Sequence, residues 1–262
     1  EGAYEKELSG ISGIRLEQKI AGGVWKPVND DNEIEPEDGA DIVTTIDVNI
    51  QDVAENALLE QLLKQDAHHG CVVLMEVKTG QVKAIANLTR SSEGKYWEQY
   101  NYAVGESTEP GSTFKLASLI AAMEDGYIEL DDSIETGNGV YKFYDQKMYD
   151  SHVGGFGTIT VKQVFEKSSN IGVAKIINDN YAKNPQKFID RLYKMNLNQK
   201  LDLEIFGEGT PHIKSANDPT WSGISLPWIS HGYEVSLTPL QILTFYNAVA
   251  NDGVMVKPQF VQ

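Results

Sequence analysis

The sequence predicts a mixed α/β fold: a central antiparallel sheet with helices on both faces, and an all-helical part beside it. Three observations support this prediction. A helical pattern over residues 48–65 precedes two short apolar runs joined by a turn, which is the order of a helix and a β-hairpin. An almost wholly apolar segment, 112–125, indicates a buried helix. Two further helical patterns, joined by a polar link, follow at 160–166 and 171–178.

Length and composition limit what this protein can be. Its 262 residues allow one large domain and a small appendage, and 41% of them are apolar, which suits a globular core. No run approaches the roughly 18–20 apolar residues of a membrane span. The formal net charge of −16 argues against broad nucleic-acid binding, which needs a basic surface. Because Cys71 is the only cysteine, neither an intrachain disulfide nor a cysteine zinc site can form.

The first 45 residues differ in composition from the rest of the chain. They are rich in glycine and proline, and the run 29–41 is mostly acidic and polar. Such segments form loops and short strands rather than a packed core. We therefore expect residues 1–45 to be a linker or the end of a preceding module, and residues 46–262 to form the main domain.

The helix and hairpin that begin the main domain have clear boundaries. Asp47 can accept hydrogen bonds from the free N–H groups of the first turn, so we expect the helix to start at Val48. A buried strand is expected at 71–75, where the residues are all apolar, and a second strand at 82–86. Residues 78–80, Lys-Thr-Gly, supply the turn between them.

Later helices are delimited in the same way. Pro110 and Gly111 precede the apolar helix of 112–125, and Gly126 suits its end. A final helix over 239–251 has a threonine cap, a proline at its first position and a glycine beyond its end.

Ser112 and Lys115 are the candidate catalytic pair. A spacing of three places them one helical turn apart on the same face. A serine hydroxyl is a weak nucleophile that needs a base, and burial in an apolar helix lowers the pKa of a lysine towards a value at which it can serve as one. Ser112 also lies at the helix N-terminus, where free N–H groups favour developing negative charge. The alternative is a capping serine beside a lysine that reaches solvent, because this short pattern is common by chance.

The link Ser168-Ser169-Asn170 between two helical patterns is the second candidate element. A hydroxyl there could relay the proton, and an amide could hold a substrate carbonyl and the lysine. An ordinary capping turn is the alternative. The two elements together are more specific than either one alone.

Residues 109–115 and 167–172 resemble the transpeptidase domain of class B penicillin-binding proteins, which carries a serine–lysine motif of this kind. The resemblance extends over nearly the whole chain, because residues 45–51, 76–86 and 232–241 look like the first helix entry, the first strand pair and the late core helix of that family. The Glu-Pro-Gly-Ser and Gly-Tyr-x-x-Ser-x-Thr-Pro sequences look closest to the division-specific (septal) branch. The first residues resemble the last part of a non-catalytic N-terminal module.

The resemblance implies a peptidoglycan D,D-transpeptidase that acts during cell division. Ser112 would attack the D-Ala-D-Ala bond of a stem peptide and form an acyl-enzyme, with Lys115 as the base. Ser168 and Asn170 would shuttle the proton and hold the substrate amide. The amine of a neighbouring stem peptide would then resolve the acyl-enzyme and cross-link two glycan strands. β-Lactams would acylate the same serine.

The resemblance implies no metal and no organic cofactor. It implies cell-division membrane proteins and a glycosyltransferase as partners, and no nucleic acid. The expected location is the outer, periplasmic face of the bacterial cytoplasmic membrane. An N-terminal transmembrane helix outside residues 1–262 would anchor the protein there.

The third motif of that family, Lys-Thr/Ser-Gly, is the one departure. In the family it lies on a strand well after the second motif, but the only Lys-Thr-Gly here, 78–80, precedes Ser112 and is interpreted as a hairpin turn. We therefore expect the main domain to be incomplete at its C-terminal side. Residues 1–262 by themselves are then expected to cross-link little or nothing, and fast stoichiometric labelling of Ser112 by a penicillin would contradict this.

Other functions built on the same motifs stay open. A D,D-carboxypeptidase or a serine β-lactamase would use the same serine, although no residue is an evident activator of deacylating water. A non-catalytic β-lactam sensor or division scaffold is a further alternative. Against pure scaffolding, no structural requirement explains four residues together: Ser112, Lys115, Ser168 and Asn170.

Several other patterns are interpreted as structural. His68 and His69 have no third ligand at metal spacing. Asp150 and His152 flank a serine, but neighbours in sequence rarely assemble a triad, so a loop near the cleft is the preferred interpretation. Four aromatic residues could line a substrate groove or pack half-buried: Tyr141, Phe143, Tyr144 and Tyr149.

Overall fold

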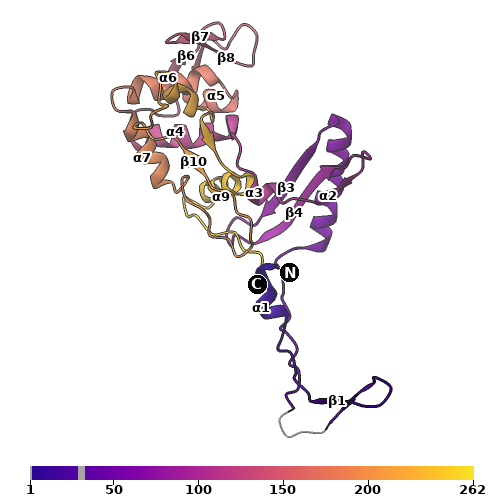
Figure 1. Ribbon diagram of the computed structural model, residues 1–262. Helices are drawn as coiled ribbons and strands as arrows, with labels where there is room; N and C mark the ends of the chain where they lie inside the picture. Colours follow the sequence, from indigo (N-terminus) through magenta and orange to yellow (C-terminus); the bar gives the residue numbers. More distant parts are fainter. Residues whose placement is uncertain (1, 29–32) are drawn as a thin grey trace.

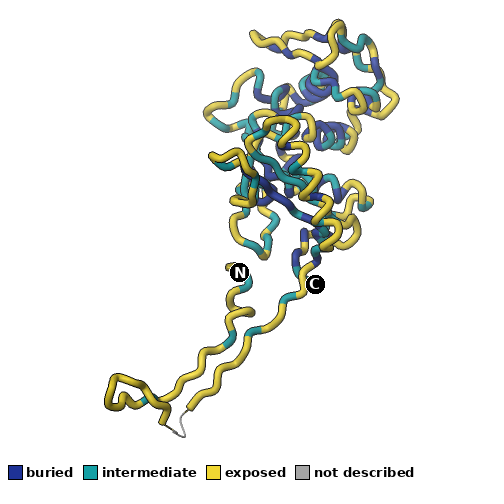
Figure 2. Tube along the Cα trace, turned by 90° about the vertical axis from the view of Figure 1, so that its right-hand side faces the viewer, coloured by how far each residue is buried: buried dark blue, intermediate teal, exposed yellow. Residues whose placement is uncertain are grey.

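The computed structural model describes residues 2–28 and 33–262, so the start of the acidic run, 29–32, lies outside the described part. Figure 1 shows a body of two lobes from which an extended arm projects. The arm consists of the 3-10 turn η1 (Gly2–Tyr4), the helix α1 (Glu5–Leu8) and the antiparallel strands β1 (Glu17–Lys19) and β2 (Trp25–Pro27). No described residue before Thr45 is buried, and Figure 2 shows the arm exposed along most of its length.

The first lobe is a three-stranded antiparallel sheet with helix α2 (Val48–Gln65) on one face. Its strands, in spatial order, are β3 (His69–Met75), β4 (Val82–Arg90) and β5 (Tyr96–Trp97). The predicted cap is confirmed, because Asp47 Oδ1 accepts the backbone N–H groups of Asn49 and Ile50. The predicted turn is confirmed as well, since residues 77–79 form the turn between β3 and β4.

The side chains of successive residues of β3 point to opposite faces of this sheet. Val73 lies opposite Ile85 and packs against α3 (Tyr102–Gly105) and α9 (Pro239–Ala250). Its neighbour Val72 lines a groove with residues of α2 on the other face. Helices therefore cover both faces of the sheet, as the sequence predicts.

Strand β3 is less buried than its run of apolar residues predicts. Its residues are half-buried, and Leu74 is 42% exposed. Within the described residues only β4 pairs with β3, which makes β3 an edge strand. An edge strand has one open side, so the prediction of a buried strand was wrong in this respect.

The second lobe is helical and contains the main hydrophobic core. Its elements are the 3-10 turn η2 (Gly111–Phe114) and the helices α4 (Lys115–Glu124), α5 (Val161–Glu166), α6 (Asn170–Tyr181), α7 (Pro185–Lys194) and α8 (Ser225–Ile229). The predicted apolar helix is thus a 3-10 turn that continues as α4. Its alanines Ala117, Ala121 and Ala122 are completely or almost completely buried, as expected of a helix that is apolar on most sides.

Short antiparallel pairs accompany these helices, so the prediction of an all-helical part was incomplete. The pairs are β6 (Ser133–Glu135) with β9 (Thr158–Thr160), β7 (Val140–Phe143) with β8 (Gln146–Tyr149), and β10 (His212–Ile213) with β11 (Val235–Ser236). Strands this short offer too few alternations for a pattern of period two to be recognised. The β7–β8 hairpin and the loop after it lie at the outer end of the helical lobe (Figure 1).

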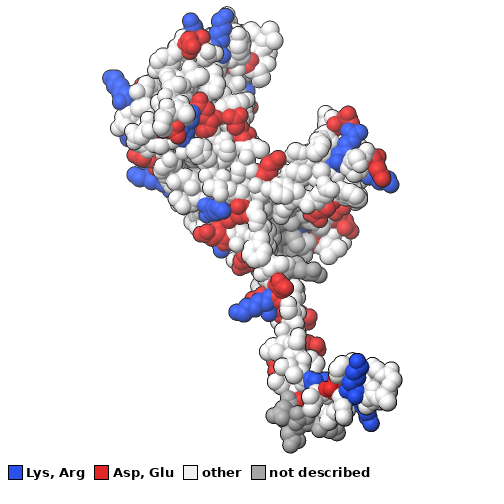
Figure 3. Space-filling view, in the orientation of Figure 1, with Lys and Arg blue, Asp and Glu red and all other residues white. Residues whose placement is uncertain are grey.

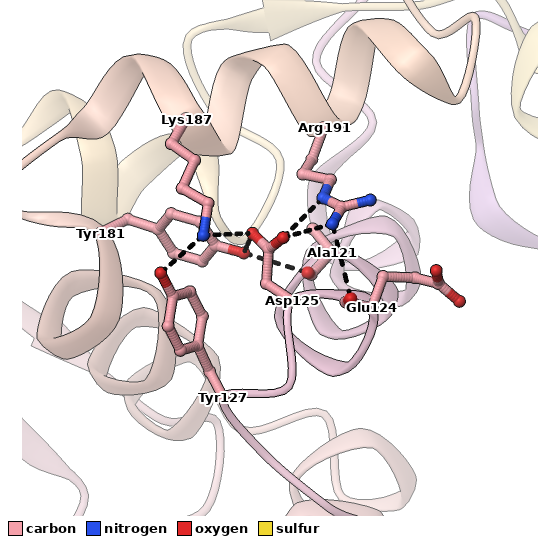
Figure 4. A network of polar contacts seen from close by, with 7 residues as sticks. All are labelled: Ala121, Glu124, Asp125, Tyr127, Tyr181, Lys187 and Arg191. Atoms are coloured by element: carbon pink, nitrogen blue, oxygen red, sulfur yellow. Dashed lines mark hydrogen bonds and ion pairs between the residues drawn. The ribbon is translucent and has the colours of Figure 1, made fainter.

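Asp125, directly after α4, ties this helix to α6 and α7 (Figure 4). Its side chain is 3% exposed, and its carboxylate accepts hydrogen bonds from the Tyr181 hydroxyl and from Arg191 Nε, both at 2.7 Å. Lys187 Nζ lies 3.4 Å from the carboxylate and donates to the hydroxyl of Tyr127. Burial by itself would raise the pKa of Asp125, but hydrogen bonds from Arg191, Tyr181 and Lys187 outweigh it and hold the pKa below its usual value.

The surface carries charges of both signs. Acidic and basic side chains are interspersed over the face seen in Figure 3. Within residues 2–28 and 33–262, no helix combines the length and the apolar character that crossing a bilayer requires.

Candidate active site

Ser112 lies exposed in the 3-10 turn that opens helix α4. Gly111 before it has a φ of +55°, a left-handed conformation that glycine adopts without strain. Residues i and i+3 of a 3-10 turn lie almost directly above one another, and the backbone N–H of Lys115 donates to the Ser112 carbonyl. The serine and the lysine are therefore one turn apart, with the serine side chain open to solvent.

Lys115 is buried at the first position of α4, with 1% of its surface exposed. Its Nζ donates to the Ser168 carbonyl at 2.6 Å and to the Ser168 hydroxyl at 2.9 Å. Burial lowers the pKa of Lys115 to about 8, although the Asp150 carboxylate acts in the opposite direction. An appreciable fraction of the lysine is therefore neutral near pH 7 and able to accept a proton.

Ser168 has a backbone conformation that residues other than glycine rarely adopt. Its φ is +54°, directly after the C-cap of α5. The N–H groups of Ser168 and Ser169 donate to the carbonyls of Phe165 and Val164, which is the Schellman arrangement in which glycine is usual. A serine in this conformation costs roughly 1–3 kcal/mol of strain, so local stability does not favour it. What a glycine would lack is the hydroxyl that contacts Lys115.

Ser169 and Asn170 connect this turn to helix α6 and to the β7–β8 hairpin. Ser169 Oγ accepts the N–H of Gly172 and so caps α6. Asn170 begins α6, and its Nδ2 donates to the carbonyl of Tyr149 at 2.8 Å. The structure thus brings Ser168 onto Lys115, whereas the amide of Asn170 bonds to the hairpin and not to the lysine.

Sequence reasoning missed two residues of the loop after α8, Gly232 beside the serine turn and His231 near the charge of Lys115. The Gly232 carbonyl accepts the Gly111 N–H at 3.1 Å, and a methyl group on Gly232 would lie 2.1 Å from Gly111 O. His231 is 6% exposed, and neither ring nitrogen has a hydrogen-bond partner among the described residues. Burial, and then the nearby Lys115 charge, lower the pKa of His231 to about 4. No periodicity marks this loop, and only its Gly-Tyr pair is distinctive in the sequence.

The β7–β8 hairpin presents aromatic side chains next to the Ser168–Asn170 turn. Tyr149, whose carbonyl accepts from Asn170, is 56% exposed. Tyr141 and Tyr144 are 39% and 65% exposed, whereas Phe143 is buried in a small core cluster. Core packing therefore explains Phe143 alone, and the three tyrosines are available to line a groove.

His69 and His152 lie in ordinary polar and aromatic contacts. His69 Nε2 lies 3.2 Å from a carboxylate oxygen of Glu106, and the ring of His152 stacks on Phe156. In the part of the chain that the structure describes, no three side chains of histidine, cysteine, aspartate or glutamate gather where a metal ion could be held.

The candidate nucleophile Ser112, the candidate base Lys115 and the Ser168 hydroxyl therefore lie in one small region. Ser112 is exposed to an incoming substrate, and Lys115 can take up a proton in its neutral form. Ser168 Oγ, within hydrogen-bond distance of Lys115 Nζ, can pass a proton to it. This arrangement is suited to acyl transfer through a covalent serine intermediate.

Known proteins are similar to this chain in sequence and fold. The family described as the penicillin binding protein transpeptidase domain matches residues 70–262. Over its whole length the chain is 28% identical to penicillin-binding protein PbpB of Mycobacterium tuberculosis, of which it covers 39%. It is 26% identical to the probable peptidoglycan D,D-transpeptidase PenA of Neisseria gonorrhoeae, over 86% of this chain and 38% of that protein. The chain thus spans about two fifths of the length of these curated relatives.

A solved structure of a penicillin-binding protein is also similar to this chain. The chain is similar to penicillin-binding protein 3 of Mycobacterium tuberculosis complexed with ampicillin, with a TM-score of 0.75 and 28% identity. The similarity covers 87% of this chain and 50% of that one.

Proposed function

Since this chain belongs to the family of penicillin-binding protein transpeptidase domains, we propose that it carries the acyl-transfer site of a peptidoglycan D,D-transpeptidase. The observation that carries the proposal is the contact of buried Lys115 with Ser168, one turn from the exposed hydroxyl of Ser112. A relative that is named a probable peptidoglycan D,D-transpeptidase supports the same reaction.

Acylation is the first half of the proposed reaction. Ser112 Oγ attacks the carbonyl carbon of the penultimate D-alanine of a stem peptide, and its proton passes to neutral Lys115, directly or through Ser168 Oγ. The C–N bond to the terminal D-alanine then breaks, and the proton returns to the leaving amine. The side chain of Asn170, which the Tyr149 carbonyl orients, would hold the substrate amide.

Deacylation is the second half. An amine of a neighbouring stem peptide attacks the ester carbonyl, Lys115 takes up the proton of that amine, and Ser112 Oγ leaves and is reprotonated. The product is a peptide bond between the two stem peptides, which cross-links their glycan strands. A β-lactam would acylate Ser112 in the same way, and the likeness to a relative complexed with ampicillin supports this.

We also propose domain boundaries, a biological role and a location for this protein. We assign residues 46–262 to the transpeptidase domain and residues 1–45 to the end of a non-catalytic module, because no described residue before Thr45 is buried and the family match begins at residue 70. The Glu-Pro-Gly-Ser and Gly-Tyr-x-x-Ser-x-Thr-Pro sequences favour a septal role. The proposed setting is the outer face of the bacterial cytoplasmic membrane, with cell-division membrane proteins and a glycosyltransferase as partners.

Labelling with a fluorescent penicillin tests the nucleophile. The full-length protein, as its host produces it, should take up one label per molecule, and Ser112→Ala should abolish the labelling. Thr113→Ala is the matched control, since it removes the neighbouring hydroxyl of the same turn, which bonds to Pro110 O. Undiminished labelling of Ser112→Ala would refute Ser112 as the nucleophile.

The lifetime of the label and the products formed from a stem peptide distinguish a transpeptidase from a β-lactamase and from a carboxypeptidase. A penicilloyl adduct that persists for hours indicates a transpeptidase, whereas loss within seconds indicates a β-lactamase. Release of D-alanine from a stem peptide without cross-linking, when acceptor amine is present, indicates a carboxypeptidase. In the host, normal division of cells that carry only Ser112→Ala would contradict a catalytic role in septation.

A further inference from the structure

Asp150 is a buried carboxylate that the proposed reaction does not use directly. It follows strand β8 and is 9% exposed. Within the described residues it forms no ion pair, and its oxygens accept hydrogen bonds from uncharged donors. Ser169 Oγ lies 3.0 and 3.1 Å from the two carboxylate oxygens, and the backbone N–H of Ile171 donates to Oδ1 at 3.1 Å. Burying a carboxylate without a cationic partner is costly, so this placement needs a reason.

The contacts of Asp150 fall on either side of Asn170. Ser169 and Ile171 both bond to its carboxylate, and Asn170 between them bonds to the carbonyl of Tyr149. Two adjacent residues of the hairpin thus hold three consecutive residues at the start of α6. The hydrogen bonds also stabilise the carboxylate, because the free N–H groups of a helix N-terminus favour negative charge.

We call these hydrogen bonds of Tyr149 and Asp150 to residues 169–171 the clamp. The clamp adjoins a strained turn. Ser168, with its φ of +54°, immediately precedes the clamped residues and places its carbonyl and hydroxyl on Lys115 Nζ. A strained residue persists only where its surroundings enforce its conformation. Asp150 supplies such enforcement from a different element, 19 residues away from Ser169 in the sequence.

Asp150 also belongs to a group of buried titratable side chains around the base. The Asp150 carboxylate, which follows the β7–β8 hairpin, raises the pKa of Lys115. The charge of Lys115 lowers the pKa of His231, which lies in the loop after α8. The carboxylate favours the charged form of the lysine, and burial opposes it. Asp150 therefore bears on the base through charge as well as through geometry.

We propose that Asp150 is a positioning residue for acyl transfer, whose carboxylate fixes the Ser168–Asn170 turn against Lys115. The inference deepens the proposed function and rests on it. Among the described residues, the carboxylate of Asp150 accepts hydrogen bonds from Ser169 and Ile171 and from neither Ser112 nor Lys115. It acts through Ser168, by holding the turn, and through Lys115, by its charge.

The pH dependence of acylation by a fluorescent penicillin in the intact protein tests this role, with Asp150→Asn as the variant. An asparagine retains the size of the side chain but loses the charge and half of the acceptor capacity. The maximal acylation rate should fall about tenfold or more, because a small displacement of catalytic groups is costly. The pH of half-maximal rate should move downwards, since the group that raises the pKa of Lys115 is lost.

Asp145→Asn is the matched control, because it removes an exposed carboxylate from the turn of the same hairpin. It should change neither the maximal rate nor the midpoint. A purely structural Asp150 would lower the melting temperature of Asp150→Asn and leave its pH midpoint at the wild-type value. That outcome, or wild-type values for both rate and midpoint, overturns the proposal.

Ser169→Ala is the second variant, and it decides the case if Asp150→Asn does not fold. It removes a donor to Asp150 but leaves the charge, so the maximal rate should fall while the pH midpoint stays unchanged. An unchanged maximal rate would overturn the proposal.

Hydrogen exchange of residues 168–172 separates this inference from the proposed function. If the wild type is not labelled at Ser112, the proposed function fails. Faster exchange of these amides in Asp150→Asn than in Asp145→Asn would still support the clamp. Equal exchange in the two variants would refute it.

Discussion

Lys115 Nζ donates a hydrogen bond of 2.9 Å to Ser168 Oγ, which joins helix α4 to the turn between α5 and α6 across 53 residues of sequence. A second hydrogen bond, to the Ser168 carbonyl, holds the ammonium in place at 2.6 Å. The proposed base, Lys115, and the hydroxyl proposed to relay the proton, that of Ser168, thus come from separate elements. Lys115 is buried, which disfavours its charged form, whereas Ser168 is half-buried.

The rate of Ser112 acylation should depend on the protonation of Lys115. With a pKa of about 8, roughly one tenth of the lysine is neutral at pH 7, so the rate should rise about tenfold per pH unit below pH 7 and level off above pH 8. Stopped-flow measurement of penicillin acylation in the intact protein checks this. A midpoint at the ordinary lysine value of 10.5 would contradict it.

Gly232→Ala should impair acylation by displacing the serine turn. The added methyl group would lie 2.1 Å from Gly111 O and 2.7 Å from Gly111 N, which are backbone atoms that cannot give way cheaply. We expect a loss of about tenfold or more in the acylation rate. Gly253→Ala is the matched control, because its φ of +84° carries the same backbone penalty while no atom lies within 4 Å of the added carbon. Similar losses in both variants would show that backbone strain alone is responsible.

Asp125→Asn should destabilise the helical lobe. The variant breaks a buried ion-pair network, which costs about 3 kcal/mol. The folded-state pKa of Asp125 is depressed, so its contribution is present above the ordinary value of 3.8 and lost as the pH falls below it. Urea unfolding of both proteins should therefore show a difference at neutral pH that shrinks under acidic conditions.

The exposed pair Lys162–Glu166 provides the control for that measurement. Its side chains are 64% and 53% exposed, so Lys162→Ala should change the stability by no more than about 0.5 kcal/mol. A loss as large as that of Asp125→Asn would indicate that burial does not decide the difference.

His231→Phe should make the protein more resistant to acid. The imidazole titrates near 6.5 in the unfolded chain and near 4 in the folded protein, so between these values the unfolded state binds more protons. The wild type should lose about 3 kcal/mol as the pH falls through this range, a loss that phenylalanine cannot show. Urea unfolding at both ends of the range measures it, and equal losses in the two proteins would refute the prediction.

Much of the fold could be predicted because its signals are local. Asp47 was recognised as a cap because its side chain bonds to N–H groups two and three residues away. The 48–65 helix and the hairpin after it followed from neighbouring residues in the same way. The edge position of β3 and the short strand pairs were not predicted, because they depend on which segments lie beside one another.

The residues of the candidate site were likewise predicted only where the signal is local in the sequence. Ser112 and Lys115 were recognised because a spacing of three places them on one turn, and Ser168 and Asn170 because the link resembles a known motif. Gly232 and His231 were missed because Gly232 bonds to Gly111 and His231 is influenced by the charge of Lys115, and both partners lie more than a hundred residues away. Asp150 was interpreted as a loop residue, since nothing in its neighbourhood shows that it is buried under α6.

From the sequence alone one can predict the helices with their caps, the hairpin, and a candidate nucleophile and a candidate base on one turn. These depend on hydrogen bonds and side-chain spacing within a few residues. The burial of Lys115 against Ser168, and the placement of Asp150 and His231 where their charges and that of Lys115 interact, follow only from the tertiary structure. Burial and long-range hydrogen bonds set the pKa of a lysine, and both arise from segments that meet only when the chain folds.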